Sequence, residues 1–120
     1  MPTIIENPVG FRSTNVPPEE IEEYVGKIST GTDSVSIARI RCPADWKEPP
    51  QQPTFDEYTL VLGGTLLVEV EGTLHTLEAG KAIITHAGER VQYSTSSHEG
   101  ADYLAVCLPA FTPEATNREE

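Results

Sequence analysis

The chain has 120 residues, a length typical of one domain that buries a single core without disulfide or metal staples. Acidic residues outnumber basic ones 19 to 8, and the formal net charge is −11. This charge argues against nucleic acid and anionic membranes as partners, because like charges repel. The sequence has no apolar run near the roughly 18 residues of a bilayer span and no visible secretory signal. With Cys42 and Cys107 as its only cysteines, we expect a cytoplasmic protein with reduced thiols.

Residues 1–20 are rich in proline and polar groups, and we expect an extended arm there. The stretch "PPEEIEEYVGKI" could begin a helix, because proline and glutamate favour a first helical turn and apolar residues follow at helical spacing. The same stretch, followed by "GTDS" and "VSIARIRC", is also typical of a β-hairpin. We favour the hairpin, since glycine and β-branched residues weaken the helix.

From residue 34 onward every segment has β character. Short runs rich in β-branched and aromatic residues are "SVSIARIRC", "EYTLVL", "TLLVEV", "TLHTL", "KAIIT", "VQYST" and "DYLAVCL". Glycine-containing pairs separate several of them, a pattern that indicates an all-β sandwich or barrel. We expect a barrel over residues 21–112 and a charged tail over residues 113–120 that lies across it.

The glycine spacing adds a resemblance. Glu57 precedes Gly64 by seven positions in "DEYTLVLGG", and Gly80 precedes Gly88 by eight in "GKAIITHAGERV". About 40 residues with this spacing resemble the two motifs of the cupin superfamily, and the strand "YLAVCLPAF" resembles the closing strand of small single-domain cupins. The resemblance implies an all-β fold, the double-stranded β-helix or jelly roll, commonly paired as a homodimer.

The metal-binding half of the cupin motifs is not matched. The paired histidines of the first motif would fall at Pro50 and Gln52 with one family spacing, or at Gln51 and Pro53 with the other. The histidine of the second motif would fall at Val91, which has no donor atom. The degenerate motif therefore predicts no bound metal and no other cofactor.

The three histidines of the chain do not replace the missing ligands. His75, His86 and His98 lie on separate segments, without the spacing that would aim two of them at one ion. His86 takes the place of the motif proline beside a turn, and we keep it as a candidate ligand-binding residue at the barrel rim.

Glu57 is the one motif ligand that remains. Strand alternation places Glu57, Thr59 and Val61 on one face, which the resemblance turns into the barrel. A carboxylate in an apolar cavity has a raised pKa and suits general acid or base catalysis, whereas an arginine partner would make it structural. If Val91 faces inward, Tyr93 does too, and it could orient a substrate or simply pack in the core.

Other polar residues leave alternatives open. Arg39 and Arg41 share one face of their strand; inside the barrel they could bind a carboxylate, and outside they would pair with acidic groups. Trp46 could wall the pocket mouth or cap the barrel end. Gln52 could help to bind the ligand.

These residues predict a small-molecule pocket, for an oxygenated or carboxylate-bearing ligand. One hypothesis is a metal-independent isomerase, cyclase or lyase that uses Glu57 as acid or base with Tyr93 and Gln52 beside it. The alternative is a non-catalytic ligand-binding or accessory module, since one fold hosts many functions. A homodimer is expected in either case, because open sheet edges need cover.

Overall fold

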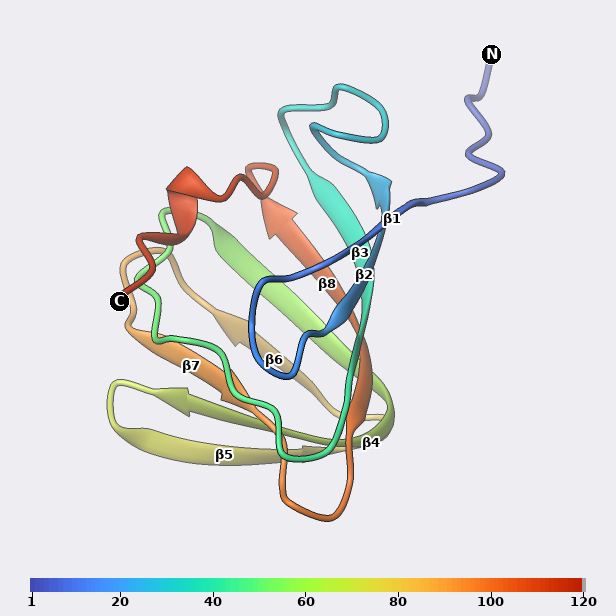
Figure 1. Ribbon diagram of the computed structural model, residues 1–120. Helices are drawn as coiled ribbons and strands as arrows, with labels where there is room; N and C mark the ends of the chain where they lie inside the picture. Colours follow the sequence, from blue (N-terminus) through green and yellow to red (C-terminus); the bar gives the residue numbers. More distant parts are fainter. Residues whose placement is uncertain (120) are drawn as a thin grey trace.

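The computed structural model describes residues 1–119 of the chain as eight strands and one short helical turn (Figure 1). All strand pairings are antiparallel. No helix in these residues is long and apolar enough to cross a membrane. The elements are β1 (Val9–Arg12), β2 (Glu20–Val25), β3 (Ser36–Cys42), β4 (Asp56–Val70), β5 (Thr73–Glu78), β6 (Ala82–Thr85), β7 (Val91–Ser94), β8 (Ala101–Leu108) and the 3-10 helix η1 (Glu114–Thr116).

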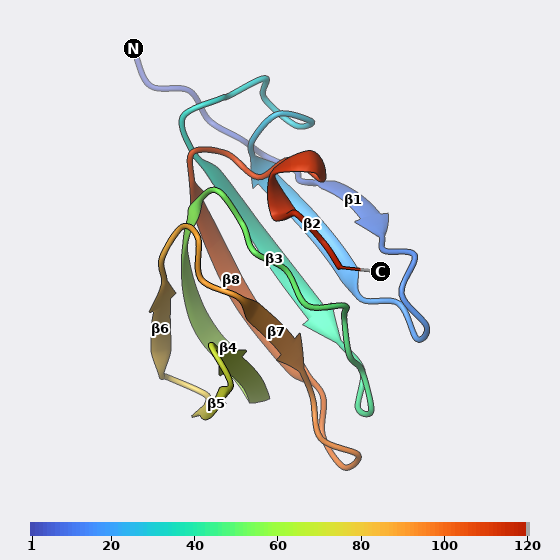
Figure 2. The same cartoon turned by 90° about the vertical axis from the view of Figure 1, so that its left-hand side faces the viewer.

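The strands form two facing layers of a barrel. The larger layer has the order β1-β2-β3-β8-β4, with β6 on the other side of β4. The smaller layer consists of β5 and β7, which pair with opposite edges of the second half of β4. Figure 2 shows β7 facing the inner side of the larger layer across the barrel.

Strand β4 belongs to both layers because it bends in the middle. The sequence predicts two strands, residues 57–62 and 65–70, but the structure joins them into one through Gly63 and Gly64. A bulge between Val61 and Gly63 interrupts the pairing with β8 at this bend. Gly64 has a φ of 69°, in the left-handed region that favours glycine.

The N-terminal region contains a strand where the sequence predicts only an extended arm. Strand β1, inside the expected arm of residues 1–20, pairs with β2, which in turn pairs with β3. The favoured hairpin therefore replaces the helical alternative for residues 20–42. β1 is not evident from sequence because its four residues have little β character of their own, and pairing with β2 makes them a strand.

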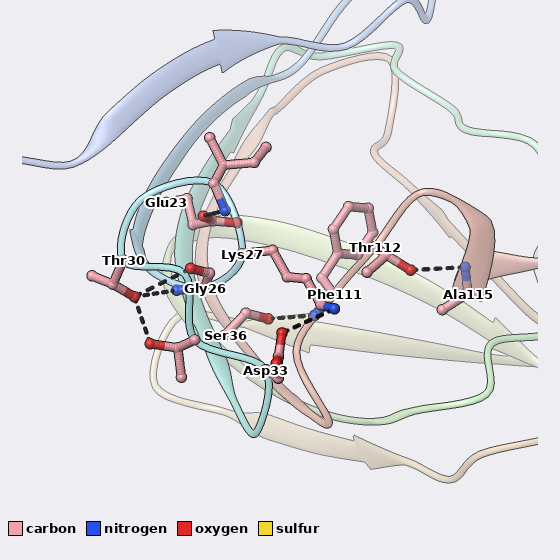
Figure 3. Close-up of polar contacts among 11 residues, drawn as sticks. Glu23, Gly26, Lys27, Thr30, Asp33, Ser36, Phe111, Thr112 and Ala115 are labelled. Atoms are coloured by element: carbon pink, nitrogen blue, oxygen red, sulfur yellow. Dashed lines mark hydrogen bonds and ion pairs between the residues drawn. The ribbon is translucent and has the colours of Figure 1, made fainter.

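The loop between β2 and β3 is bound to the C-terminal segment (Figure 3). The Ala110 backbone N–H donates to the Asp33 carbonyl oxygen, and the Phe111 N–H donates to Ser36 Oγ at 2.9 Å. Within the loop, the Glu23 carboxylate accepts the backbone N–H groups of Ile28 and Ser29. These bonds hold the segment that follows β8 against the top of β3.

The rest of the tail crosses the top of the barrel and hydrogen-bonds to the loop before β4 (Figure 1). The backbone N–H of Gln52 donates to the Thr116 carbonyl, and that of Glu119 donates to the Pro50 carbonyl. The expected tail of residues 113–120 thus lies across the barrel over its described part, while Glu120 lies outside the described residues.

The bend in β4 yields a stability prediction. A Cβ added at Gly64 would overlap the carbonyl oxygen of Gly100, while one added at Gly72, with a φ of 83°, would meet nothing within 4 Å. Gly72→Ala should cost only the left-handed backbone penalty of about 1 to 2 kcal/mol. Gly64→Ala adds a backbone clash, so it should cost at least about 2 kcal/mol more in urea unfolding. Equal losses for the two variants would contradict this account of the bend.

Candidate functional site

A cavity of about 420 Å³ opens between the two layers, beneath the N-terminal loop and the tail. Its floor comes from the inner faces of β2, β3, β4, β7 and β8, and its rim comes from residues 11–14 and the segment after β8. This volume suits a small organic ligand. The lining residues on which the argument depends are Glu48, Gln51, Glu57, Tyr93, Tyr103 and Cys107.

The barrel is hollow at this end because two paired strands carry small inward side chains. Ala38 of β3 lies opposite Ala105 of β8, and Ser36 lies opposite Cys107. All four line the cavity. The other end is filled by larger residues that form the core, among them Trp46, Val61, Leu66, Val68 and Leu77.

Glu57 extends into the cavity from β4 and is only 9% exposed. Thr59 Oγ1 donates to one carboxylate oxygen at 3.3 Å, and the Cys107 thiol lies 3.8 Å from the other. Among residues 1–119 no basic side chain forms an ion pair with Glu57. Burial raises the Glu57 pKa to about 7, against smaller opposing effects of hydrogen bonds from Thr59, Tyr93 and Cys107.

A second buried carboxyl group, Glu48, faces the same cavity and was not a candidate from sequence. Its backbone N–H donates to the Tyr93 carbonyl, which places it opposite an inward-facing residue of β7. Burial raises the pKa of Glu48 well above its usual value, and the nearby charges of Glu57 and Glu19 raise it further, while Arg118 opposes them. Two carboxyl groups of this kind do not readily ionise together.

The irregular segment before β4 explains why Gln51, and not Gln52, faces the cavity. Gln51 and Val91 exchange two backbone hydrogen bonds of 2.8 Å, so Gln51 shares the inward face of Val91. Glu48 pairs with Tyr93 and Gln51 pairs with Val91, so this segment has two residues between the pairs where β7 has one. The two residues are prolines, which cannot donate a backbone hydrogen bond to a neighbouring strand. This bulge resets the alternation, and both Glu48 and Gln51 point inward.

Gln52, which the sequence predicts to bind the ligand, lies outside the cavity lining. Gln52 is exposed, and its side-chain amide donates to the Gly88 carbonyl at 2.9 Å. The buried amide is Gln51, whose Nε2 donates to Glu48 Oε2 at 3.1 Å. Of the two family spacings considered from sequence, the one that selects Gln51 and Pro53 matches the buried positions.

Tyr93 lines the cavity beside Glu57 and is almost fully buried. Its ring lies nearly parallel to that of Tyr103, with 6.5 Å between ring centroids and 14° between planes. Burial, followed by the charge of Glu57, holds the Tyr93 pKa well above its usual value, so the hydroxyl keeps its proton. The Tyr93 hydroxyl lies 3.4 Å from Thr85 Oγ1.

Trp46 does not line this cavity; it is 1% exposed and belongs to the packed core. Its indole N–H donates to Glu19 Oε1 at 3.2 Å. Glu19 also accepts hydrogen bonds from Ser13 and Asn15, so its carboxylate holds the N-terminal loop in place. Trp46 therefore packs within the core and does not wall the pocket mouth.

Arg39 and Arg41 face away from the cavity. Arg39 forms a bidentate pair with Asp102, with contacts of 2.9 and 2.6 Å, and Arg41 pairs with Glu22 at 2.6 Å. The Arg39 guanidinium accordingly lowers the pKa of Asp102, mainly through hydrogen bonding. The alternate residues of β3 point inward, so these arginines cannot hold a carboxylate ligand there, and the expectation of carboxylate binding loses its support.

His86 is exposed beside the turn after β6 and does not line the cavity. Its backbone N–H donates to Glu89 Oε1 at 2.6 Å, which makes the segment a surface turn. The expectation that His86 binds the ligand is therefore not met by its placement.

The residues at the family's metal-ligand positions carry few metal-donor atoms. Gln51, Pro53 and Val91 stand at three of these positions, and only Glu57 brings a strong ligand. Within residues 1–119 no three His, Cys, Asp or Glu side chains lie close enough together to hold a metal ion.

Comparison with solved structures shows the fold. A predicted oxalate decarboxylase from Thermotoga maritima has a TM-score of 0.74 and 17% identity, over 91% of this chain and 99% of its own. A variant of Streptomyces PAC13 with uridine has a TM-score of 0.76 and 12% identity, over 99% and 90%. The polyketide cyclase RemF from Streptomyces resistomycificus has a TM-score of 0.69 and 14% identity, over 98% and 89%. The protein has the all-β cupin fold, as the sequence predicts.

Comparison of the sequence gives a different kind of match. No protein-family model matches the chain. It is 44% identical over 101 residues to a protein of Myxococcus xanthus named endoribonuclease YbeY. The match takes in 84% of this chain but 34% of that protein, so this chain spans about a third of the relative's length.

The burial of Glu57 predicts a pH effect on stability. Because its folded pKa of about 7 lies above the ordinary value of 4.5, its contribution to stability is present below pH 4.5 and is lost as pH rises to about 7. That loss amounts to roughly 3 kcal/mol, since each pKa unit corresponds to about 1.4 kcal/mol. Urea unfolding of Glu57→Gln across this window should show a smaller decline than the unmodified protein. A decline of equal size in both would contradict the raised pKa.

Proposed function

We propose that the protein binds a small molecule in the cavity and catalyses a metal-independent proton transfer on it. Isomerisation, cyclisation and elimination are the reaction classes that proton transfer alone can drive. The observation that carries the proposal is Glu57: a buried carboxyl group that has no ion-pair partner among residues 1–119, in a cavity large enough for a ligand. With a pKa of about 7 it can accept or donate a proton at neutral pH.

The neighbours of Glu57 suit this role. Glu57 would take a proton from the substrate, and Glu48, kept neutral by burial, could supply one elsewhere on the molecule. Tyr93 retains its proton and could donate a hydrogen bond to an oxygen atom that gains negative charge. Two fold neighbours are described as a polyketide cyclase and a nucleoside dehydratase, which is compatible with such chemistry in this barrel.

The second candidate is an accessory ligand-binding module. It is favoured by the match to about a third of a longer protein, because a related segment occurs there as one part of a larger chain. In that case the cavity would bind a ligand without turning it over. We do not propose the endoribonuclease activity named in that match for this chain, because its net charge of −11 disfavours contact with RNA phosphates.

We also propose that the protein is a homodimer. The main support is the outer face of the larger layer, and the open sheet edges are a lesser argument. The outer face of the larger layer carries adjacent apolar side chains that are 39 to 50% exposed. Tyr58 lies opposite Ile84, and Leu60 lies opposite the half-buried Leu104, so the patch continues across β6, β4 and β8. An apolar face of this kind is typical of an interface. A cytoplasmic location remains a prediction from the sequence.

An assay that needs no known substrate tests the enzymatic proposal. The protein is incubated in deuterium oxide with a pool of small metabolites, and mass spectrometry follows deuterium uptake or loss of water. We expect at least one compound to change with the unmodified protein, about 100-fold more slowly with Glu57→Gln, and at an unchanged rate after chelation of metals.

Glu22→Gln is the matched control, because it removes the same charge from the outer face of β2, where Glu22 pairs with Arg41. It should react like the unmodified protein. Identical spectra for Glu57→Gln and the unmodified protein would refute catalysis by Glu57 and shift support to the accessory module.

The dimer is tested by multi-angle light scattering at micromolar concentration. The unmodified protein should give the mass of two chains, and Leu60→Lys should give that of one, because the new charge would be buried in the interface. A monomer mass for the unmodified protein would refute the dimer.

A further inference from the structure

The cavity is unusually acidic. Four of its lining residues are glutamates that are each less than 10% exposed: Glu19, Glu23, Glu48 and Glu57. Two of them are occupied by structural hydrogen bonds, Glu19 with Trp46 and the N-terminal loop, and Glu23 with the backbone of Ile28 and Ser29. The other two remain available to a ligand.

Glu48 and Glu57 lack strong protein partners. Glu48 accepts one hydrogen bond, from the neutral amide of Gln51, and Glu57 accepts long ones from a hydroxyl and a thiol. Within residues 1–119 neither carboxylate has a salt bridge. The basic residues that line the cavity, Arg12 and Arg118, are exposed at the rim, and Arg12 is paired with Glu20.

Aromatic rings line the same cavity. Tyr93 and Tyr103 lie nearly parallel on its wall, and Phe11 and Phe111 stand at its rim. The face of an aromatic ring attracts a positive charge, and desolvation strengthens that attraction. Carboxylates and aromatic rings together form a complementary environment for a cation, whereas an anionic ligand would meet buried carboxylates.

We propose that the ligand of this cavity is a small organic molecule with a positively charged nitrogen, which binds between Glu48, Glu57 and the two tyrosine rings. The inference deepens the proposed small-molecule site and rests on it. The ligand's nitrogen supplies the charge that the two carboxylates lack in the protein, and the cavity volume of about 420 Å³ leaves room for an uncharged remainder.

Binding of a cation should release protons. Below pH 7 Glu57 is mostly protonated, and the raised pKa of Glu48 favours its protonated form as well. A bound cation favours the ionised forms of both carboxyl groups, so its binding must displace protons. Affinity for a cation therefore rises with pH through the Glu57 pKa of about 7. Among residues 1–119 the other titratable or charged groups near the two carboxyl groups are Cys42 on β3, Tyr93 on β7, Tyr103 and Cys107 on β8, Glu19 before β2 and Arg118 on the tail.

The test uses three probes with one carbon skeleton and three charges: benzylamine, which is cationic in this range, benzyl alcohol and benzoate. Isothermal titration calorimetry from about pH 5 to about pH 8 gives their affinities, and buffers of different ionisation enthalpy give the protons released. Benzylamine should bind most tightly, release protons and gain at least about tenfold in affinity over the range, since one released proton gives at most tenfold per pH unit.

Variants locate the effect. Glu57→Gln and Glu48→Gln should each weaken benzylamine about tenfold or more and leave benzyl alcohol nearly unchanged. Glu22→Gln, which alters the net charge equally on the outer face, should not weaken either probe. Ala105→Val should weaken all binding, because the larger side chain would fill part of the cavity that β3 and β8 line.

The outcomes separate this inference from the function on which it rests. Preference for benzyl alcohol or benzoate, or benzylamine binding without proton release, would overturn the cationic ligand and leave the small-molecule cavity intact. No binding by any probe, together with no chemical-shift change at cavity residues in NMR spectra, would overturn both.

Discussion

The bend of β4 at Gly63 and Gly64 is the constraint on which the rest of the structure depends. Before the bend, β4 pairs with β6 and β8; after it, β4 pairs with β5 and β7. One strand therefore holds Glu57 in the larger layer and positions β7, with Tyr93, in the facing layer. The close approach of Gly64 to Gly100 fixes the angle, and with it the distance across the cavity.

Strand alternation made part of the site predictable. Glu57, Thr59 and Val61 are all buried, and so are Val91 and Tyr93, as a period of two requires. The cupin architecture followed from glycine spacing and short β-rich runs. The face of Arg39 could not be predicted, because β3 carries apolar and polar residues on both parities and only packing against the other layer decides between them.

The rest of the site depends on irregular backbone. Glu48 and Gln51 lie in a proline-rich segment that reads as a loop, although it pairs with β7 through backbone hydrogen bonds. The bulge at the prolines changes which residues face inward, and the pattern of apolar and polar residues in the sequence does not predict this change. Trp46 and Glu48 precede the bulge, are two residues apart and are both buried. Their spacing is the available sequence signal that Glu48 shares the inward face of Trp46.

The position of the cavity mouth between the N-terminal loop and the tail makes the two chain ends unequal for protein engineering. The first residues lead away from the barrel (Figure 1), whereas Thr116 and Arg118 of the tail line the cavity. An affinity handle or surface tether joined to the amino end would leave access to the interior open. The same group joined to the carboxyl end would crowd the entrance and compete with whatever enters it.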